Sequence, residues 1–263
     1  MVIKRTAAPI PTPFGVTLKH WRTTRRLSQL ALASRAGTPP RHVSFLETGR
    51  ARPSQDMVLR LAHALDVPLA ERNRMLTAAG FAPAYAERPL TDVALAEVRF
   101  VLDRLLHAHE PYPALVLDAW YTVLEANGAA QQLLPPPMPG EPVERPNLIE
   151  LLLGPYQQII VNWREVLRDT QQRMQHEAST RTGDARFLDL LQRVDSAAGP
   201  FEAGALPRTE SPVLLTQLRT PEGVINTLST FVYFGSARDV TVEGMHVELM
   251  YPADAAADRY FRR

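Results

Sequence analysis

The sequence predicts a two-domain α+β protein: an all-α domain of five helices, then a domain with about five strands in one sheet and helices on one face. Three observations predict this. Up to Gly80, apolar residues recur at helical spacing and follow capping residues. From Pro113, short β-type runs accompany longer helical ones. Between them, residues 81–90 are punctuated by proline and predict a linker.

Charge divides unevenly between the two parts. Residues 1–88 carry fourteen Lys and Arg against five Asp and Glu, whereas residues 89–263 carry fifteen against twenty-three. A basic N-terminal part and an acidic remainder favour phosphate binding by the N-terminal part alone. The chain has no cysteine, which excludes disulfides and thiolate metal sites. No window of about 18 apolar residues and no secretory signal occurs, so we expect a cytoplasmic protein without a membrane partner.

The first domain is expected over residues 17–80. Residues 1–16, with three prolines and no periodicity, predict a flexible arm. A first helix is predicted over 17–26. Ser28 is a plausible N-cap for a second helix, which ends before Gly37, a residue that accepts positive φ at no steric cost.

The third helix has the pattern of a helix that enters the DNA major groove. Thr38 is expected to cap it, with Pro39 at its first position. Val43 and Leu46 are three residues apart and face inward, and Gly49 ends the helix. The side chains expected to face DNA are Gln29, Thr38, Pro40, Arg41, His42, Ser44, Phe45, Arg50 and Arg52.

These residues divide into two roles. We expect Arg41 and Ser44 to reach base edges and Phe45 to contact a thymine methyl group. The remaining polar and basic side chains would hold phosphates and set the register. The alternative for Phe45 is a core position, and for His42 a solvated one. Two more helices, one capped by Ser54 and one over 69–79, complete the domain.

This segment resembles the Xre/Cro-type helix-turn-helix family. The resemblance rests on Ser28-Gln29, Ala36-Gly37, Val43-Ser44-Phe45-Leu46-Glu47 and Gly49-Arg50, and it departs at Pro39-Pro40, where many members carry polar residues. It implies a sequence-specific transcription regulator that binds double-stranded DNA. It also implies that Arg22 pairs with Glu47 and braces the first helix to the recognition helix. Because one recognition helix reads few base pairs, we expect a homodimer on a two-fold site.

The second domain is expected over residues 91–252, before a C-terminal tail at 253–263. A long helix capped by Thr91 runs to about His109, and its apolar stripe lies either at a subunit contact or against its own domain (Leu95, Val98, Leu102 and Leu105). Asn127 caps a helix over 128–134, and residues 135–146 form a loop. Further helices are predicted over 154–179 and 184–197, and strands over 114–118, 121–125, 213–218, 224–234 and 240–251.

Residues 90–252 resemble the ligand-binding domain of MmyB-like transcription regulators. The resemblance rests on Pro113–Asp118, Val123–Ala130, Asn162-Trp163-x-x-Val166 and Asp184-x-x-Phe187-x-x-Leu190. It implies a PAS-like pocket that holds a small apolar molecule such as a fatty acid. The Arg- and Gly-rich segment usual between the two helices is replaced here by Gln172–Glu177.

We therefore expect apolar walls around a ligand and one polar group for its head. The head group would meet Arg164, Arg168 or Tyr233. The expected lining residues are Leu117, Trp120, Leu148, Leu152, Ile160, Trp163, Phe187, Leu191, Leu228, Phe231, Val232, Tyr233 and Met245. The alternative is that these residues form a filled core, in which case the second domain only dimerises or docks another protein.

The sequence contains no motif typical of a catalytic site or a metal site. The seven histidines include no pair four residues apart on one helix face, and no glycine-rich phosphate loop or nucleophile elbow occurs. We expect no catalytic residue, no metal and no cofactor apart from the apolar ligand.

Overall fold

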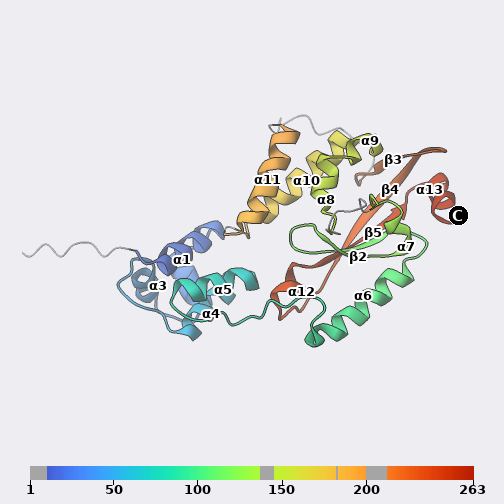
Figure 1. Ribbon diagram of the computed structural model, residues 1–263. Coiled ribbons are helices and arrows are strands. Elements are labelled where there is room, and N and C mark those ends of the chain that lie inside the picture. The colour runs from blue at the N-terminus through green and yellow to red at the C-terminus, as the bar shows by residue number, and fades with distance from the viewer. Residues whose placement is uncertain (1–10, 137–144, 182, 200–211) are drawn as a thin grey trace, which may run out of the picture. The chain divides into compact units, whose positions relative to one another are not determined.

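The computed structural model describes residues 11–136, 145–181, 183–199 and 212–263 (Figure 1). The chain divides into two compact units, Met1–Glu87 with Arg238–Val240, and Arg88–Ala237 with Thr241–Arg263. Within the first unit, the Val240 N–H donates a hydrogen bond to the Ala86 carbonyl at 2.8 Å. None of the helices in the described ranges is both long and apolar enough to cross a membrane.

Five helices build the described part of the first unit: α1 (Pro13–Thr24), α2 (Gln29–Arg35), α3 (Pro40–Glu47), α4 (Gln55–Ala64) and α5 (Leu69–Ala78). Ser28 and Ser54 cap α2 and α4 as predicted, because each side chain accepts a hydrogen bond from a backbone N–H three residues on. Gly37 has a φ of 60°, as its place in the turn requires. Val43 and Leu46 are fully buried with Trp21 in one core.

Two local predictions for this unit were wrong. Helix α1 begins at Pro13, inside the segment predicted as an arm, because the Thr12 hydroxyl accepts a hydrogen bond from the Gly15 N–H. Residues 1–10 of that arm lie outside the described residues. Thr38 does not cap α3: Pro39 occupies the N-cap position and Pro40 the first helical one. The Thr38 N–H instead donates to the Ala33 carbonyl and closes the end of α2.

The second unit is built on a five-stranded antiparallel sheet of order β2-β1-β5-β4-β3, which confirms the predicted α+β class. The strands are β1 (Ala114–Leu117), β2 (Val123–Ala126), β3 (Thr216–Thr220), β4 (Gly223–Tyr233) and β5 (His246–Pro252). The described helical segments are η1 (Val93–Leu95), α6 (Ala96–Ala108), α7 (Gly128–Gln131), α8 (Leu148–Leu153), α9 (Tyr156–Ile159), α10 (Trp163–Ala178), α11 (Ala185–Ala198), α12 (Val240–Gly244) and α13 (Ala255–Phe261).

The two faces of this sheet carry separate cores. Helices α8, α10 and α11 pack on one face around Phe187 and Leu218 (Figure 1). Helix α6 packs on the opposite face around Val116 and Val247, in addition to the single helical face that we predicted. Leu95 of η1 and Leu102 of α6 are buried in this second core, so the predicted apolar stripe packs against its own domain.

Several predicted elements differ at their ends. The helix predicted from Thr91 begins as a 3-10 turn capped by Asp92, whose carboxylate accepts from the Ala94 N–H. The helix predicted over 154–179 is interrupted at Ile160, which forms a β-bridge with Leu218. Helix α8, capped by Asn147, was not predicted. A non-local strand pairing and a short capped turn are both hard to read from periodicity alone.

The C-terminal part differs most. The strand predicted over 240–251 is helix α12 followed by β5, so only its second half is extended. The predicted tail at 253–263 contains helix α13. Asp254 caps this helix by accepting from the Ala257 N–H at 2.7 Å. Asp254 has the residue type and place of an N-cap, which is the local signal that predicts such a helix.

Candidate DNA-binding surface and ligand cavity

A buried carboxylate holds the end of α3 in place. Glu47 is only 5% exposed, and its oxygens accept from Arg22 Nε at 2.6 Å and Arg22 Nη2 at 3.0 Å. The Gln29 amide donates to the same carboxylate at 2.8 Å, and Arg22 Nη1 donates to the Leu27 carbonyl at 2.8 Å. The hydrogen bond that Arg22 donates to Glu47 raises the pKa of Arg22, so this guanidinium stays charged. Helices α1, α2 and α3 are thereby joined at one point.

This arrangement contains the Arg22–Glu47 pair that the Xre/Cro resemblance implies. It also gives Gln29 a different place from the one expected. We predicted that the Gln29 side chain holds a phosphate, but its amide points to Glu47.

The outer side of α3 carries an aromatic ring between two arginines. The guanidinium groups of Arg41 and Arg50 lie over the Phe45 ring, at 5.0 and 5.9 Å from its centroid. Phe45 is half-buried and is not part of the buried core of this unit. Stacking of this kind fixes the two cationic groups above an apolar surface. The side of α3 turned from the core therefore presents both charge and a flat apolar ring.

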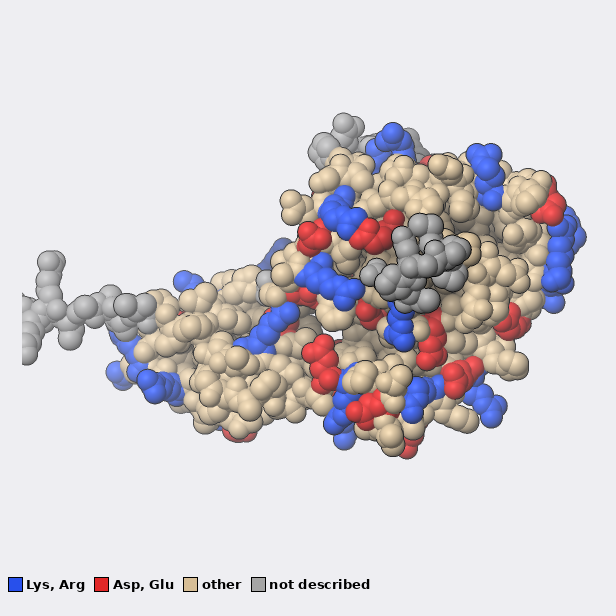
Figure 2. All heavy atoms as spheres, viewed as in Figure 1, with Lys and Arg blue, Asp and Glu red and all other residues tan. Residues whose placement is uncertain are grey.

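The other residues predicted to face DNA have mixed exposure. Pro40, Arg41, Arg50 and Arg52 are exposed, whereas Thr38, His42 and Ser44 are half-buried. Figure 2 shows Lys and Arg side chains on the first unit with few Asp or Glu among them in this view, while both signs are intermixed on the second unit. The charge difference seen along the sequence is thus present on the surface.

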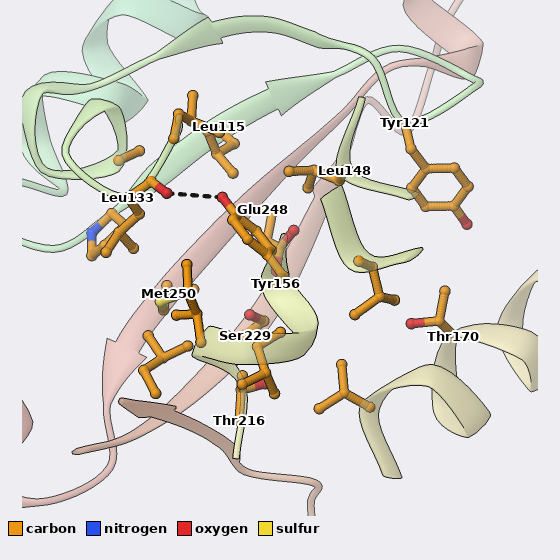
Figure 3. A pocket seen from close by; sticks show the side chains of 18 of the residues that line it. Leu115, Tyr121, Leu133, Leu148, Tyr156, Thr170, Thr216, Ser229, Glu248 and Met250 are labelled. Atoms are coloured by element: carbon orange, nitrogen blue, oxygen red, sulfur yellow. Dashed lines mark hydrogen bonds between the residues drawn. The ribbon is translucent and has the colours of Figure 1, made fainter. Parts of the chain in front are cut away.

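The second unit contains a cavity of about 320 Å³ between the sheet and helices α8, α9 and α10 (Figure 3). Its sheet side is made by inward-facing residues of four strands: Leu115, Thr216, Leu218, Thr220, Ser229, Phe231, Glu248 and Met250. Its helical side is mostly apolar: Leu148, Ile149, Leu152, Tyr156, Ile159, Ile160, Val166, Thr170 and Arg173. Both the volume and the apolar walls suit a small molecule.

Four of the thirteen residues predicted to line a pocket do line this cavity: Leu148, Leu152, Ile160 and Phe231. Others belong to packed cores: Trp120, Trp163, Phe187 and Leu191 to the helical core, Leu117 to the β1–β2 core, and Met245 to the α6 core. The indole N–H groups of Trp120 and Trp163 donate to Asp184 and to the Leu152 carbonyl.

Leu228 and Val232 of β4 were predicted to line the cavity and do not, because successive residues of a strand point to opposite faces of the sheet. Ser229 and Phe231 point into the cavity, so Leu228 and Val232 belong to the opposite face of the sheet. Tyr233 has the right parity but lies at the strand end, is 62% exposed, and stacks on His246. Arg164 and Arg168, predicted to hold a ligand head group, are exposed and do not line this cavity.

The polar groups of the cavity were not identified from the sequence. Glu248 is the acidic side chain in the lining, and burial raises its pKa above the ordinary value. The Tyr156 hydroxyl donates to the Leu133 carbonyl at 2.9 Å, and burial raises the Tyr156 pKa to about 12 (Figure 3). Arg173 lies with its guanidinium 4.8 Å from the centroid of the Phe231 ring. The signal for Glu248 was its place inside the apolar run His246–Tyr251.

Within the described ranges, no group of three or more His, Asp or Glu side chains is arranged to hold a metal ion.

Two family models match the chain. One, described as the MmyB-like transcription regulator ligand binding domain, matches residues 98–263. The other, described as a helix-turn-helix domain, matches residues 13–75. A search of curated proteins found no match.

Solved structures are similar to parts of the chain. The restriction-modification controller protein C.AhdI from Aeromonas hydrophila is 36% identical, with 23% of this chain and 92% of that chain covered and a TM-score of 0.23. The clp gene regulator ClgR from Corynebacterium glutamicum is 26% identical, with 26% and 86% covered and a TM-score of 0.23. An RNA-binding Light-Oxygen-Voltage receptor is 14% identical, with 95% and 60% covered and a TM-score of 0.24. These TM-scores are too low to support a statement about the fold of the whole chain.

Proposed function

Because the chain belongs to the MmyB-like transcription regulators, whose ligand-binding domain matches residues 98–263, we propose that a small apolar ligand in the cavity controls its binding to DNA. The helix-turn-helix domain makes the protein a DNA-binding transcription regulator, and neither matched family is one of enzymes. The observation that carries the ligand proposal is the apolar cavity of about 320 Å³ between the sheet and α8–α10.

Base reading is assigned to Arg41, Ser44 and Phe45. Arg41 is exposed, and its stacking on Phe45 directs a guanidinium outward from α3. An arginine can donate two hydrogen bonds to one guanine, and an aromatic edge can contact a thymine methyl group. We assign phosphate binding to Arg50 and Arg52, which follow the helix and are exposed.

The proposed DNA-binding species is a homodimer. Helix α3 has only eight residues, three of which are buried. One such helix reads too few base pairs for a selective site, whereas two copies related by a two-fold axis read two half-sites.

The ligand proposal needs a molecule with an apolar body. A fatty acid has a chain that the leucine and isoleucine walls can surround. For such a ligand to regulate, it must bind one DNA-binding state of the protein more tightly than another.

The test compares DNA affinity with and without the ligand. Native mass spectrometry of protein purified from cells, followed by denaturation, would identify a bound small molecule. Fluorescence anisotropy with DNA from the protein's own promoter would then compare the loaded protein with protein stripped by organic extraction. We expect different affinities, and equal affinities would favour a second domain that serves only dimerisation or docking.

A cavity-filling variant sharpens this test. Leu148→Trp would place an indole in the cavity, since Leu148 lines it. We expect this variant to bind DNA identically with and without added ligand. The matched control is Leu188→Trp on α11, since Leu188 is 39% exposed and lies outside the lining. It should keep the ligand response of the parent protein.

A further inference from the structure

Glu248 places a carboxyl group inside the apolar cavity. On β5, Glu248 and Met250 face the cavity, because residues of one strand alternate between the two faces. Glu248 pairs with Phe231 of β4 on one side and with Leu115 of β1 on the other. It therefore lies in the middle strand of the sheet, and Figure 3 shows it among the lining side chains rather than at their edge.

The carboxyl group has little of its hydrogen-bonding capacity used. The Ser229 hydroxyl hydrogen-bonds it, and a carboxyl group can take part in several more such bonds. The nearby cation is Arg173, but its guanidinium lies over Phe231 and its Nη2 donates to the Thr170 hydroxyl at 3.3 Å. The Nε of Arg173 forms an ion pair with Asp169 at 3.2 Å, so the charge of Arg173 is paired within α10.

Glu248 is half-buried and lines the cavity, so a bound ligand can become a partner of its carboxyl group. We propose that Glu248 holds the polar head of the ligand, and that this head is a neutral hydroxyl on an apolar chain rather than the carboxylate of a fatty acid. This inference rests on the proposed function of the cavity. The proposed ligand differs from the fatty acid that the family resemblance implies, because its head group is inferred from the side chain at position 248 of this chain.

Charge and solvation favour a neutral head. A carboxylate would bring a second acidic group against Glu248, and both would lose water. An ammonium group would need an ionised Glu248, although burial raises the pKa of this residue, and the positive Arg173 lies close by. A hydroxyl group can donate to an ionised carboxyl group, or donate to and accept from a protonated one, so it matches either state.

The experiment measures the binding of three probes to the full-length protein after organic extraction. The probes are n-decanol, n-decylamine and decanoate, which share one chain and differ in the head group. We expect n-decanol to bind at least tenfold more tightly than decanoate in isothermal titration calorimetry, with a matching rise in melting temperature. Tightest binding of decanoate or of n-decylamine would overturn the neutral-head inference and leave the proposed ligand function standing. Binding of none of the three would instead count against the apolar ligand itself.

Two substitutions tie the preference to Glu248. Glu248→Leu should weaken n-decanol binding by roughly threefold to tenfold, the usual effect of one net hydrogen bond. Glu248→Gln keeps a group that donates and accepts, so it should retain n-decanol binding and lose much of the discrimination against decanoate. Glu97→Leu, at an exposed position on α6, is the control and should leave all three affinities unchanged. An unchanged preference in Glu248→Leu would refute the assignment of Glu248.

Discussion

At the scale of single residues, one carboxylate fixes the recognition helix and another gives the cavity its polarity. Glu47 accepts three N–H donors from two other helices. In the described part of the chain, Glu248 has the Ser229 hydroxyl as a partner and lines a mostly apolar cavity. The first is therefore a structural group whose bonds are made, and the second has bonds still to make.

Removing the Glu47 carboxylate should destabilise the first unit. Glu47→Ala would leave the Arg22 guanidinium largely buried without its partner, which typically costs about 3 kcal/mol or more. Urea unfolding measures this change. The control is Asp56→Ala, whose ion pair with Arg60 is exposed and contributes at most about 1 kcal/mol. Equal effects of the two substitutions would contradict a structural role for the Glu47 network.

The two arginines beside Phe45 should affect DNA binding differently. Arg41→Ala should weaken binding about tenfold on sites with the preferred bases and less on other sequences, because it removes direct base contacts. Arg50→Ala should weaken binding equally on every sequence and make the salt dependence shallower. Anisotropy titrations over operator variants and salt concentrations check both. A uniform loss in Arg41→Ala would remove its base-reading role.

The ionisation of Glu248 should show in the pH dependence of stability. Burial raises its pKa above that in the unfolded chain, so the folded protein holds this proton more tightly. The contribution of this group to the free energy of unfolding is therefore fully present below its pKa in the unfolded chain. It is lost as the pH rises through its higher pKa in the folded protein. Glu248→Gln should gain stability relative to the parent protein across that interval and then level off. Urea unfolding at a series of pH values measures the difference, with Glu97→Gln as the control.

At the scale of elements, a glycine sets the distance between α1 and α3. A Cβ atom on Gly15 would lie 2.6 Å from the Leu46 carbonyl oxygen and 2.8 Å from that of Glu47. Those are backbone atoms, so only a shift of one helix can relieve the contact. The same turn of α3 carries the Glu47 network, which a shift would also disturb.

Gly15→Ala should therefore destabilise the first unit by about 1–3 kcal/mol, the usual range for overpacking, and weaken DNA binding. Thermal unfolding and anisotropy measure the two effects. Gly235→Ala is the matched control, because nothing lies within 4 Å of a Cβ atom there and its backbone is not in the left-handed region. If the alanine at residue 15 left both quantities unchanged, close packing of α1 on α3 would be refuted.

At the scale of the whole molecule, the protein should bind DNA as two copies. The expected complex has two chains per duplex, with half-sites about 34–36 Å apart or a multiple of that spacing. Analytical ultracentrifugation of the complex gives the stoichiometry, and footprinting gives the spacing. A single chain bound to a single half-site at saturation would contradict this arrangement.

The sequence by itself determined what depends on a few neighbouring residues. Ser28, Ser54 and Asn127 cap the helices that they were predicted to cap, because a cap is settled within about four residues. The buried positions of α3 and the change from helical to strand periodicity were also correct, since both follow from local spacing.

Only the tertiary structure decided which residues surround the cavity. Lining depends on which face of β4 and β5 meets the helices, and on pairings between segments far apart in the chain, such as Ile160 with Leu218. Choosing apolar residues by type therefore selected core positions such as Phe187 and passed over Glu248. A charged residue in an apolar run becomes meaningful only when the sheet shows that it points inward, because burial then changes its ionisation and leaves it in need of a partner.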